Sequence, residues 1–240
     1  MKQKVICIIP ARGGSKSIKL KNLSLIGGKP LIYFPIISAI KSGVCDEIFV
    51  STDNKKIAIE AKKYGAKVPF LREKKYSGDF ITTEDTLKNA LISYEKFVGH
   101  KFDICVFLTC TNIFRDHNDI TLAVNKLRKK KKIDSAFTVK KLYRHFWTIK
   151  NKKLKKVLPW MKRYHSRQNA PKLFREETSV VCATRARFWR NGKRIGKNVH
   201  LIENKFPFSE IDINDKFDLQ MANFALKILK KNKYLSKKII

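Results

Sequence analysis

The feature that most limits the fold of this chain is an alternation of short apolar runs with amphipathic segments. The first run, Val5–Pro10 (VICIIP), contains no polar residue, which is typical of a central parallel strand buried on both faces. Similar runs and helical patterns alternate through the first 140 residues. The expected strands are Val5–Ile9, Glu47–Ser51, Lys67–Leu71, Ile104–Leu108 and Ser135–Val139, and the expected helices are Leu31–Lys41, Lys55–Tyr64, Thr83–Phe97 and Asp119–Lys129. This order predicts an α/β fold with a mostly parallel, doubly wound sheet and helices on both faces.

The alternation stops after Lys140. Residues 141–180 contain aromatic residues, paired lysines and the turn signal Asn151-Lys152, which favour a small β-rich insertion over another strand-helix unit. A helical stripe returns between Asp215 and Lys233. The sequence therefore predicts a core made of residues 1–140 and 181–240, with residues 141–180 inserted into it.

The charge of the chain is strongly positive. Lysine and arginine total 53 against 20 acidic residues, a formal net charge of +33, and such an excess is typical of nucleic-acid binders. However, 41 of the 53 are lysines, many in short runs such as Lys129–Lys132, and the sequence has no zinc-finger spacing, RNP-type aromatic motif or basic region followed by heptads. We therefore expect solvated lysine-rich faces and no specific nucleic-acid partner. Binding of nucleic acid through bulk charge stays open as an alternative, which a steep loss of binding with salt would reveal.

Composition also bounds the location of the protein. Hydrophobic residues make up 43% of the chain, which indicates a globular protein. No apolar stretch approaches the roughly 20 residues that a membrane span needs, and the first apolar run is too short for a signal-peptide core. We expect a cytoplasmic protein without membrane insertion, whose cysteines are reduced thiols rather than zinc ligands because they are odd in number and widely spaced. They are Cys7, Cys45, Cys105, Cys110 and Cys182.

A small basic loop directly follows the first predicted strand. Its glycines allow backbone N–H groups to approach an anion, while Arg12, Lys16 and Lys21 add positive charge. In an open α/β sheet, ligands bind beyond the carboxyl ends of the strands, where this loop would lie. The loop matches neither the P-loop pattern nor the dinucleotide fingerprint. It therefore predicts an anion site that suits a phosphate chain, with an ordinary tight turn as the alternative.

The residues of this loop also carry a resemblance. Ile9–Lys16 (IPARGGSK), followed at matching spacing by Ile18, Lys21, Asn22 and Leu23, resembles the signature of the acylneuraminate cytidylyltransferases. These are the CMP-sialic acid synthetases and their relatives that act on legionaminic and pseudaminic acids. Further similar segments follow in the same order along nearly the whole chain. They are Gly28–Leu31, Val50–Asp53, Tyr64–Ala66, Val68–Pro69, Leu71–Arg72, Leu108–Arg115, Arg167-Gln168 and Ile211–Ile213.

The resemblance implies a Rossmann-like nucleotidyltransferase fold and a magnesium-dependent transfer of CMP. In such a reaction the anomeric hydroxyl of an acidic sugar attacks the α-phosphate of CTP and pyrophosphate leaves. The residues implied in nucleotide binding are Arg12, Gly13, Ser15, Lys16, Lys21, Asn22 and Arg72, and those implied in catalysis are Arg12, Lys21 and Asp212. Two alternatives stay open: Arg72 as an exposed cation at a strand end, and Lys21 as one surface lysine among many.

The implied metal site departs from the family pattern. Family members often carry Asp-Ile-Asp where this chain has Asp212-Ile213-Asn214, followed by Asp215. Magnesium prefers oxygen ligands, commonly one or two carboxylates with phosphate oxygens and waters, so the resemblance implies Asp212 and Asn214 as ligands. On a strand, alternation would put these two side chains on one face and Asp215 on the other. The alternative is that Asn214 or Asp215 caps the final helix.

The implied sugar site departs further. Where family members often have Leu-Gln-Pro-Thr-Ser-Pro-Leu-Arg, this chain has Leu108–Arg115 (LTCTNIFR), and Arg175–Thr178 (REET) stands where an Asn-Gly pair is common. The neighbouring thiol, Cys110, is expected to be a buried side chain and no nucleophile, because the reaction needs no covalent intermediate. The implied sugar-binding residues are Thr109, Thr111, Asn112, Arg167 and Gln168, with Arg167 as a clamp for the sugar carboxylate.

In the family, the inserted segment forms a homodimer and reaches the active site of the partner subunit. We expect packing or interface roles for His145, Trp147 and His165, which lie in this segment. The hypothesis from the sequence is therefore a dimeric cytidylyltransferase that activates a sialic-acid-like sugar for surface polysaccharides. Two alternatives are an enzyme that uses CTP with a different acceptor sugar and a catalytically weakened homologue with a role in binding or assembly.

Overall fold

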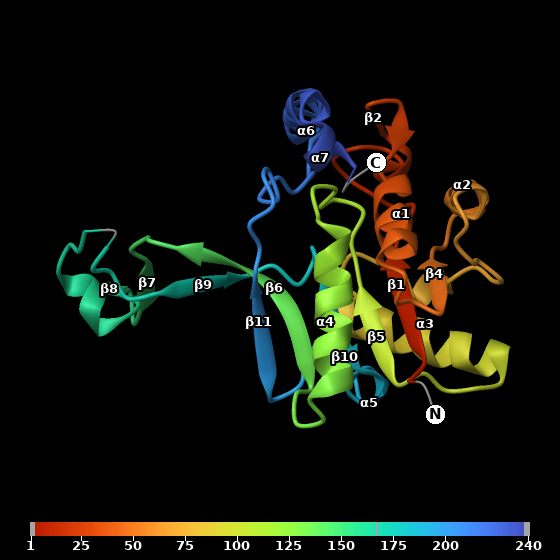
Figure 1. The fold of residues 1–240 in the computed structure, drawn as a ribbon, viewed down its shortest axis with the longest axis horizontal. Coiled ribbons are helices and arrows are strands. Elements are labelled where there is room, and N and C mark those ends of the chain that lie inside the picture. The colour runs from red at the N-terminus through yellow and green to blue at the C-terminus, as the bar shows by residue number, and fades with distance from the viewer. Residues whose placement is uncertain (1–2, 167, 238–240) are drawn as a thin grey trace.

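The computed structural model describes residues 3–166 and 168–237. A seven-stranded sheet forms the centre, and six of its strands follow the order β11-β6-β10-β5-β1-β4, while β9 pairs with β6 (Figure 1). Its strands are β1 (Val5–Pro10), β4 (Glu47–Ser51), β5 (Ile104–Phe107), β6 (Ser135–Leu142), β9 (Leu173–Glu176), β10 (Cys182–Arg185) and β11 (Val199–Glu203). Along the six-strand path, β10 runs antiparallel to its neighbours β5 and β6, and the other pairings are parallel. The prediction of an α/β fold with a mostly parallel sheet is confirmed.

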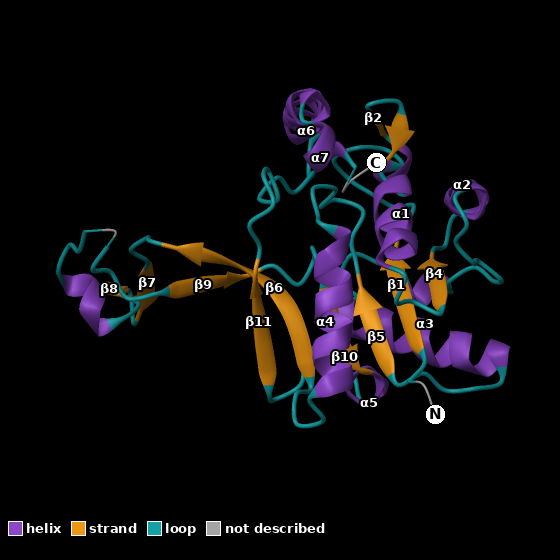
Figure 2. Cartoon of the chain, viewed as in Figure 1, coloured by secondary structure: helices purple, strands orange, loops and turns teal. Residues whose placement is uncertain are grey.

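Helices cover both faces of this sheet (Figure 2). One hydrophobic cluster joins the sheet to α1, α2, α4 and α6, and a second joins the opposite face to α3 and α5. The helices are α1 (Tyr33–Ser42), α2 (Lys55–Lys63), α3 (Thr83–Val98), α4 (His117–Lys129), α5 (Ala186–Arg190), α6 (Lys216–Lys231) and the short α7 (Lys233–Ser236). The sheet is therefore doubly wound. Among the described residues, no helix combines the length and apolar character needed to cross a membrane.

Local signals explain where these helices begin and end. Asn54 accepts hydrogen bonds from the first turn of α2, and Thr82 accepts one from the backbone N–H of Asp85 in α3, which satisfies backbone donors that a helix start leaves free. Gly43 and Gly99 follow α1 and α3 with φ of 64° and 72°, a conformation that glycine adopts without a Cβ penalty. The predicted helices at these positions are confirmed within a few residues.

One expected strand is wrong. Residues 67–71 do not form a strand and contribute a single parallel bridge between Lys67 and Phe49. Pro69 lies inside this run and has no N–H for a ladder. Short elements complete the core: β2 (Leu25–Ile26), β3 (Lys29–Pro30), η1 (Lys21–Leu23) and η2 (Lys74–Tyr76).

Residues 141–180, called the arm below, extend from one end of the sheet (Figure 1). The outer half of β6 pairs with β9, and beyond them β7 (Trp147–Lys150) and β8 (Lys153–Lys156) form a separate two-stranded sheet, followed by η3 (Pro159–Lys162). The turn of this hairpin is Asn151-Lys152, where both residues have positive φ. The arm is therefore rich in β-structure, as its turn signal and aromatic content indicate.

Candidate active site

The loops after β1, β4 and β5 meet at one edge of the sheet, because these strands are parallel neighbours. Three cavities lie there, each named below for one of its residues. The Arg72 cavity has a volume of about 280 Å³, the Lys21 cavity about 220 Å³ and the Glu177 cavity about 210 Å³. Arg12 and Thr109 line both of the first two cavities. The predicted position of a ligand at the carboxyl ends of the strands therefore coincides with this group of cavities.

The glycine loop after β1 is held against the loop after β4. The backbone N–H of Gly13 donates to Asp53 Oδ1 at 2.8 Å. A Cβ on Gly13 would lie 2.9 Å from the Cβ of Asn54, so the close approach of the two loops requires glycine. Asn22 is buried and donates from Nδ2 to the carbonyl of Arg12 at 3.0 Å. The loop is thus fixed from both sides, with Arg12, Ser15, Lys21 and Asn22 lining the Lys21 cavity.

Two cations of this loop share a carboxylate that sequence reasoning missed. Arg12 Nη1 lies 2.9 Å from Asp79 Oδ1, and Lys16 Nζ lies 2.8 Å from Asp79 Oδ2. The hydrogen bond from Lys16 is the main cause that lowers the pKa of the Asp79 carboxyl, and burial opposes it. Asp79 lies in the segment that closes the Arg72 cavity, and no motif or spacing in the sequence connects it with the glycine loop.

Lys21 connects the glycine loop to the predicted metal loop. Its Nζ donates to the carbonyl of Ile213 at 2.8 Å, across 192 residues of sequence. Burial lowers the pKa of Lys21, and the nearby Asp212 and Asp218 oppose this effect. Lys21 is therefore half-buried between the two loops and hydrogen-bonded to one of them.

Arg72 lines the first cavity together with Arg12. Its side chain is buried, and its Nε donates to Ser77 Oγ at 3.0 Å. Burial lowers the pKa of this guanidinium, which Asp53 partly offsets. The alternative of an exposed cation at a strand end is therefore wrong.

The residues after β5 form a compact hydrogen-bonded turn. Thr109 Oγ1 lies 3.0 Å from both Asn112 Oδ1 and the carbonyl oxygen of Ser179, to either of which its single proton can be donated, and Thr111 Oγ1 lies 3.4 Å from Thr109 Oγ1. Thr109 and Thr111 face the Lys21 cavity, while Asn112 faces the Glu177 cavity. Cys110 between them is buried, and burial raises the pKa of its thiol to about 12, as expected for a thiol that is no nucleophile.

The Glu177 cavity contains charged residues that the sequence marked only as a departure from the family. Arg175 Nη2 lies 2.6 Å from Glu177 Oε1, and Asn204 Nδ2 donates to Glu177 Oε2 at 3.1 Å. Glu177 is buried, so these partners hold its carboxylate in one orientation. Asp212 and Asn112 line the same cavity. The cavity therefore brings together a predicted metal ligand and a predicted sugar-binding residue.

The predicted metal loop lies just before α6 and is no strand. Asn214 Nδ2 donates to Asp212 Oδ2 at 3.2 Å. The two side chains are therefore adjacent, as expected, but they lie in a loop and not on one face of a strand. Asp215 and Asp218 form a capping box at the start of α6, which confirms the capping alternative for Asp215 and leaves Asp212 outside the cap. Within the described part of the chain, no three His, Cys, Asp or Glu side chains form a metal-binding group. The exposed carboxylate of Asp212 fits a magnesium ion that takes its other ligands from phosphate and water. The amide nitrogen of Asn214, and not its oxygen, faces this carboxylate.

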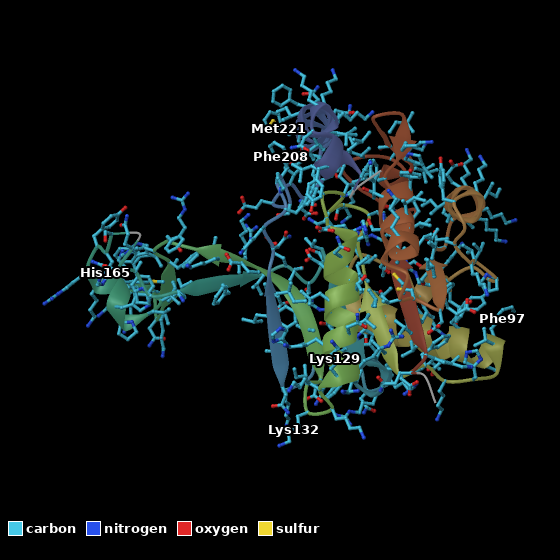
Figure 3. The ribbon with its side chains drawn as sticks, viewed as in Figure 1. Phe97, Lys129, Lys132, His165, Phe208 and Met221 are labelled. Atoms are coloured by element: carbon cyan, nitrogen blue, oxygen red, sulfur yellow. The ribbon has the colours of Figure 1, made fainter. Side chains whose placement is uncertain are left out.

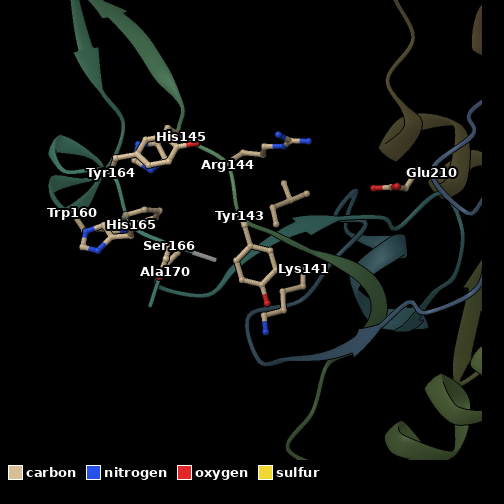
Figure 4. A pocket seen from close by; sticks show the side chains of 11 residues that line it. Lys141, Tyr143, Arg144, His145, Trp160, Tyr164, His165, Ser166, Ala170 and Glu210 are labelled. Carbon is tan, nitrogen blue, oxygen red and sulfur yellow. The ribbon is translucent and has the colours of Figure 1, made fainter. Parts of the chain in front are cut away.

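The remaining predicted sugar-binding residues lie on the arm. Gln168 lines a shallow cavity with Lys141 and Tyr143, and the structure does not bring it next to Thr109 within one chain. Arg167 falls outside the described residues. A larger cavity of about 440 Å³ is lined mainly by residues of the arm, among them Arg144 and His165, and by the core residue Glu210 (Figure 4).

The histidines of the arm take part in aromatic packing. The ring of His145 stacks on Tyr164, with 5.1 Å between the ring centroids, and meets Trp160 edge-on at 5.4 Å. His165 packs against the other side of this group through Trp160 at 5.9 Å. Figure 3 shows His165 at the far end of the arm, away from the core. These contacts agree with the packing role expected for both histidines.

Comparison with known proteins identifies the family. A family profile described as cytidylyltransferase matches residues 6–215. The chain belongs to this cytidylyltransferase family. It is 49% identical over 88 residues to a pseudaminic acid cytidylyltransferase of Campylobacter jejuni, which covers 37% of this chain and 38% of the relative. It is 40% identical over 121 residues to a CMP-N,N'-diacetyllegionaminic acid synthase of Legionella pneumophila, which covers 50% of this chain and 52% of the relative.

A longer but weaker match covers most of the chain. A CMP-N,N'-diacetyllegionaminic acid synthase of Campylobacter jejuni is 29% identical over 230 residues, or 93% of this chain and 95% of the relative. Among solved structures, a CMP:2-keto-3-deoxy-manno-octonic acid synthetase complexed with CTP superposes with a TM-score of 0.68 at 13% identity, covering 94% of this chain and 99% of that one. A 4-diphosphocytidyl-2C-methyl-D-erythritol synthase from Anaerococcus prevotii gives 0.66 at 14% identity with the same coverage. These similarities show that the present chain has the expected nucleotidyltransferase fold.

Proposed function

We propose that this cytidylyltransferase transfers CMP from CTP to the anomeric hydroxyl of an acidic, sialic-acid-like sugar. The observation that carries the proposal is the link between Lys21 and the carbonyl of Ile213. This link joins a loop whose cations suit a triphosphate to a loop whose carboxylate, Asp212, faces a separate polar cavity. The arrangement offers one compartment for a nucleotide, one for an acceptor, and charged groups between them.

The chemistry requires positioning and charge neutralisation rather than a covalent intermediate. The acceptor oxygen forms a bond to the α-phosphorus of CTP, and the bond from this phosphorus to the β-phosphate oxygen breaks. Pyrophosphate leaves with the bonding electron pair, and the hydroxyl proton passes to water. Arg12 and Lys21 line the cavity in which the phosphates would lie, so their charges would stabilise the developing negative charge. Arg72 would contact the base from the neighbouring cavity.

Asp212, with Asn214 beside it, would hold the magnesium ion that the reaction requires. Such an ion neutralises phosphoryl oxygens and lowers the pKa of a bound hydroxyl. The contribution of this chain is to keep the carboxylate in place: Asn214 donates to it, and Lys21 holds the adjacent backbone.

The names of the relatives guide the choice of acceptor. Pseudaminic and legionaminic acids appear in those names, so nonulosonic acids are the acceptors to test first. Glu177 and Arg175, in the Glu177 cavity proposed for the acceptor, depart from the family pattern. A different acidic sugar is therefore the second candidate.

We also propose a homodimer in which the arm contacts the partner subunit. A two-stranded hairpin is marginally stable by itself in water, yet β7 and β8 lie apart from the core and expose Trp147, Ile149 and Leu154. Gln168 lies on the same arm, which would place a predicted sugar-binding residue near a second active site. The exposed apolar side chains support an interface rather than a free monomer.

A pyrophosphate-release screen tests the activity. Purified protein is incubated with magnesium and one of CTP, UTP, GTP or ATP, together with a panel of nonulosonic and deoxy-ulosonic acids. We expect release only with CTP and at least one of these acids, with a CMP-sugar as the product by mass spectrometry. Asp79→Asn and Asp212→Asn enzyme serve as site variants, and the latter should lose the signal. Tight CTP binding without turnover on any acid would instead support the weakened homologue.

A further inference from the structure

Arg115 is a buried cation to which no role has been given above. It ends the loop between β5 and α4, and its side chain is completely buried. Burial is the main cause that lowers its pKa to about 10, and the charged or titratable groups that affect it are the thiols of Cys110 and Cys7. The described residues supply no carboxylate for an ion pair, and the buried Nη1 has no hydrogen-bond partner among them. Burial of an unpaired charge is costly, so stability alone does not account for this arginine.

The guanidinium joins two segments that form the walls of the cavities. Its Nε donates to the carbonyl of Val180 at 2.9 Å, and its Nη2 donates to the carbonyl of Thr109 at 2.8 Å. A longer contact of 3.5 Å reaches the carbonyl of Ser179. Ser179 in turn accepts hydrogen bonds from both the backbone N–H and the hydroxyl of Thr109. One buried side chain therefore contacts both the segment at Thr109 and the segment at Ser179-Val180.

These segments face different compartments. Thr109 lines the Arg72 and Lys21 cavities, whereas Ser179 and Val180 line the Glu177 cavity. The guanidinium contacts therefore tie the wall of one compartment to the wall of the other. In a reaction between two bound molecules, a misplacement of about 1 Å can lower the rate about 100-fold.

We propose that Arg115 is a positioning residue that sets the separation between the nucleotide compartment and the acceptor compartment. The inference rests on the proposed function, because the two compartments matter only if two substrates react across them. It goes beyond that function by assigning the alignment to a side chain that touches neither substrate.

Arg185 provides a matched comparison elsewhere in the chain. Its Nε donates to the carbonyl of Ile133 at 2.9 Å, and its Nη2 donates to the carbonyls of Leu127 and Lys130 at 2.9 and 3.2 Å. It is thus a second arginine that joins backbone segments through carbonyls, and it lines none of the three cavities. Arg185 is more exposed than Arg115, so its replacement is expected to change stability by a different amount. The thermal midpoint of each variant is therefore measured alongside its rate.

The test uses Arg115→Lys and Arg115→Gln, with Arg185→Lys as the control. For each protein we measure the thermal midpoint, the Kd for CTP without acceptor, kcat, and the acceptor KM. If Arg115 positions the compartments, both Arg115 variants keep the Kd for CTP within about two-fold while kcat falls about 10- to 100-fold. Arg185→Lys loses thermal stability but keeps its kcat. Added guanidinium at millimolar concentration should restore part of the rate of Arg115→Gln and none in the control.

The opposite results are equally distinct. An Arg115 variant whose kcat falls no more than that of Arg185→Lys shows a purely structural arginine and overturns the inference. The same conclusion follows if both Arg115 variants fail to fold while the control folds. If the unmodified enzyme transfers CMP to no acceptor, the proposed function fails and the inference falls with it, which the parallel assay of unmodified enzyme reveals directly.

Discussion

Replacement of Lys21 by methionine is the sharpest test of the candidate site. Methionine has a similar length but no charge, so Lys21→Met removes a cation from the Lys21 cavity without leaving a large void. The same change removes the hydrogen bond from Nζ to the carbonyl of Ile213, which ties the glycine loop to the loop carrying Asp212. Both losses act on the site, and neither removes a core contact.

The expected magnitude comes from these two losses. A preorganised donor directed at developing charge contributes about 2.7–4 kcal/mol to transition-state stabilisation. A hydrogen bond from a charged group contributes about 1.5–3 kcal/mol, but the two terms share one amine and do not add. We therefore expect kcat/KM to fall about 100- to 1000-fold.

The assay is pyrophosphate release at CTP concentrations below KM, so that the rate reports kcat/KM. Lys19→Met is the control, because Lys19 is an exposed lysine of the same loop and lines none of the three cavities. The control should match the unmodified enzyme. A Lys21→Met enzyme that stays within three-fold of it would refute both the phosphate role and the importance of the loop contact.

The pKa of Lys21 adds a pH signature to this prediction. Burial lowers this pKa below the ordinary lysine value, so the ammonium loses its proton at a lower pH than an exposed lysine. The charge is present below that pKa and is lost as the pH rises through it, so activity should decline on the alkaline side. Lys21→Arg should move this decline to higher pH, because guanidinium stays protonated. An alkaline limb that is identical in Lys21→Arg would assign it to another group.

Three further predictions concern the metal, the core and the assembly. Asp212→Ala should abolish turnover while circular dichroism shows an intact fold, and near-normal turnover of this variant would contradict the metal assignment. Asn214→Asp should lower the half-saturating magnesium concentration about three- to ten-fold, because it adds a charged ligand. Glu95→Gln removes the charge from a bidentate ion pair with Arg190, at 2.6 and 3.0 Å. It should cost about 2 kcal/mol, the scale of a hydrogen bond to a charged group, and lower the thermal midpoint by about 4–8 °C. An unchanged midpoint would show that the ion pair adds nothing to stability. Sedimentation at micromolar concentration should give a dimer, and a fully active monomer would exclude the proposed role of the arm.

The core of the fold was predictable because its signals are local. Every residue of the apolar runs Val5–Ile9 and Ile104–Leu108 is buried, so burial on both faces of the sheet is directly visible as an uninterrupted apolar run in the sequence. The position of the site followed from the same reasoning, since parallel strands end at a common edge. Within this edge, however, the contact between Lys21 and Ile213 spans 192 residues. No periodicity or spacing encodes such a contact, and only the resemblance placed both residues in one site.

Helix α6 shows where periodicity reaches its limit. The stripe formed by Phe217, Met221, Phe224 and Ile228 correctly indicated a helix, but these side chains are exposed, and Figure 3 shows Met221 at the outside of the molecule. The face that packs on the core consists of Ala222, Ala225, Leu226 and Leu229. A helix with apolar residues on two faces has no single preferred side in sequence, so the choice depends on the shape of the neighbouring core.

The predicted phosphate-binding cations already have partners within the protein. Asp79 pairs with Arg12 and Lys16, and the carbonyl of Ile213 accepts a hydrogen bond from Lys21. A triphosphate would therefore exchange one set of partners for another, and the net gain is smaller than the charges alone suggest. A chain with a net charge of +33 attracts anions in general, and pyrophosphate is such an anion. An enzyme that held pyrophosphate too tightly would turn over slowly. Uniform binding lowers KM without raising kcat. If Arg12 and Lys16 hold the phosphates as proposed, competition from the Asp79 carboxylate would favour release of pyrophosphate while leaving these cations in place.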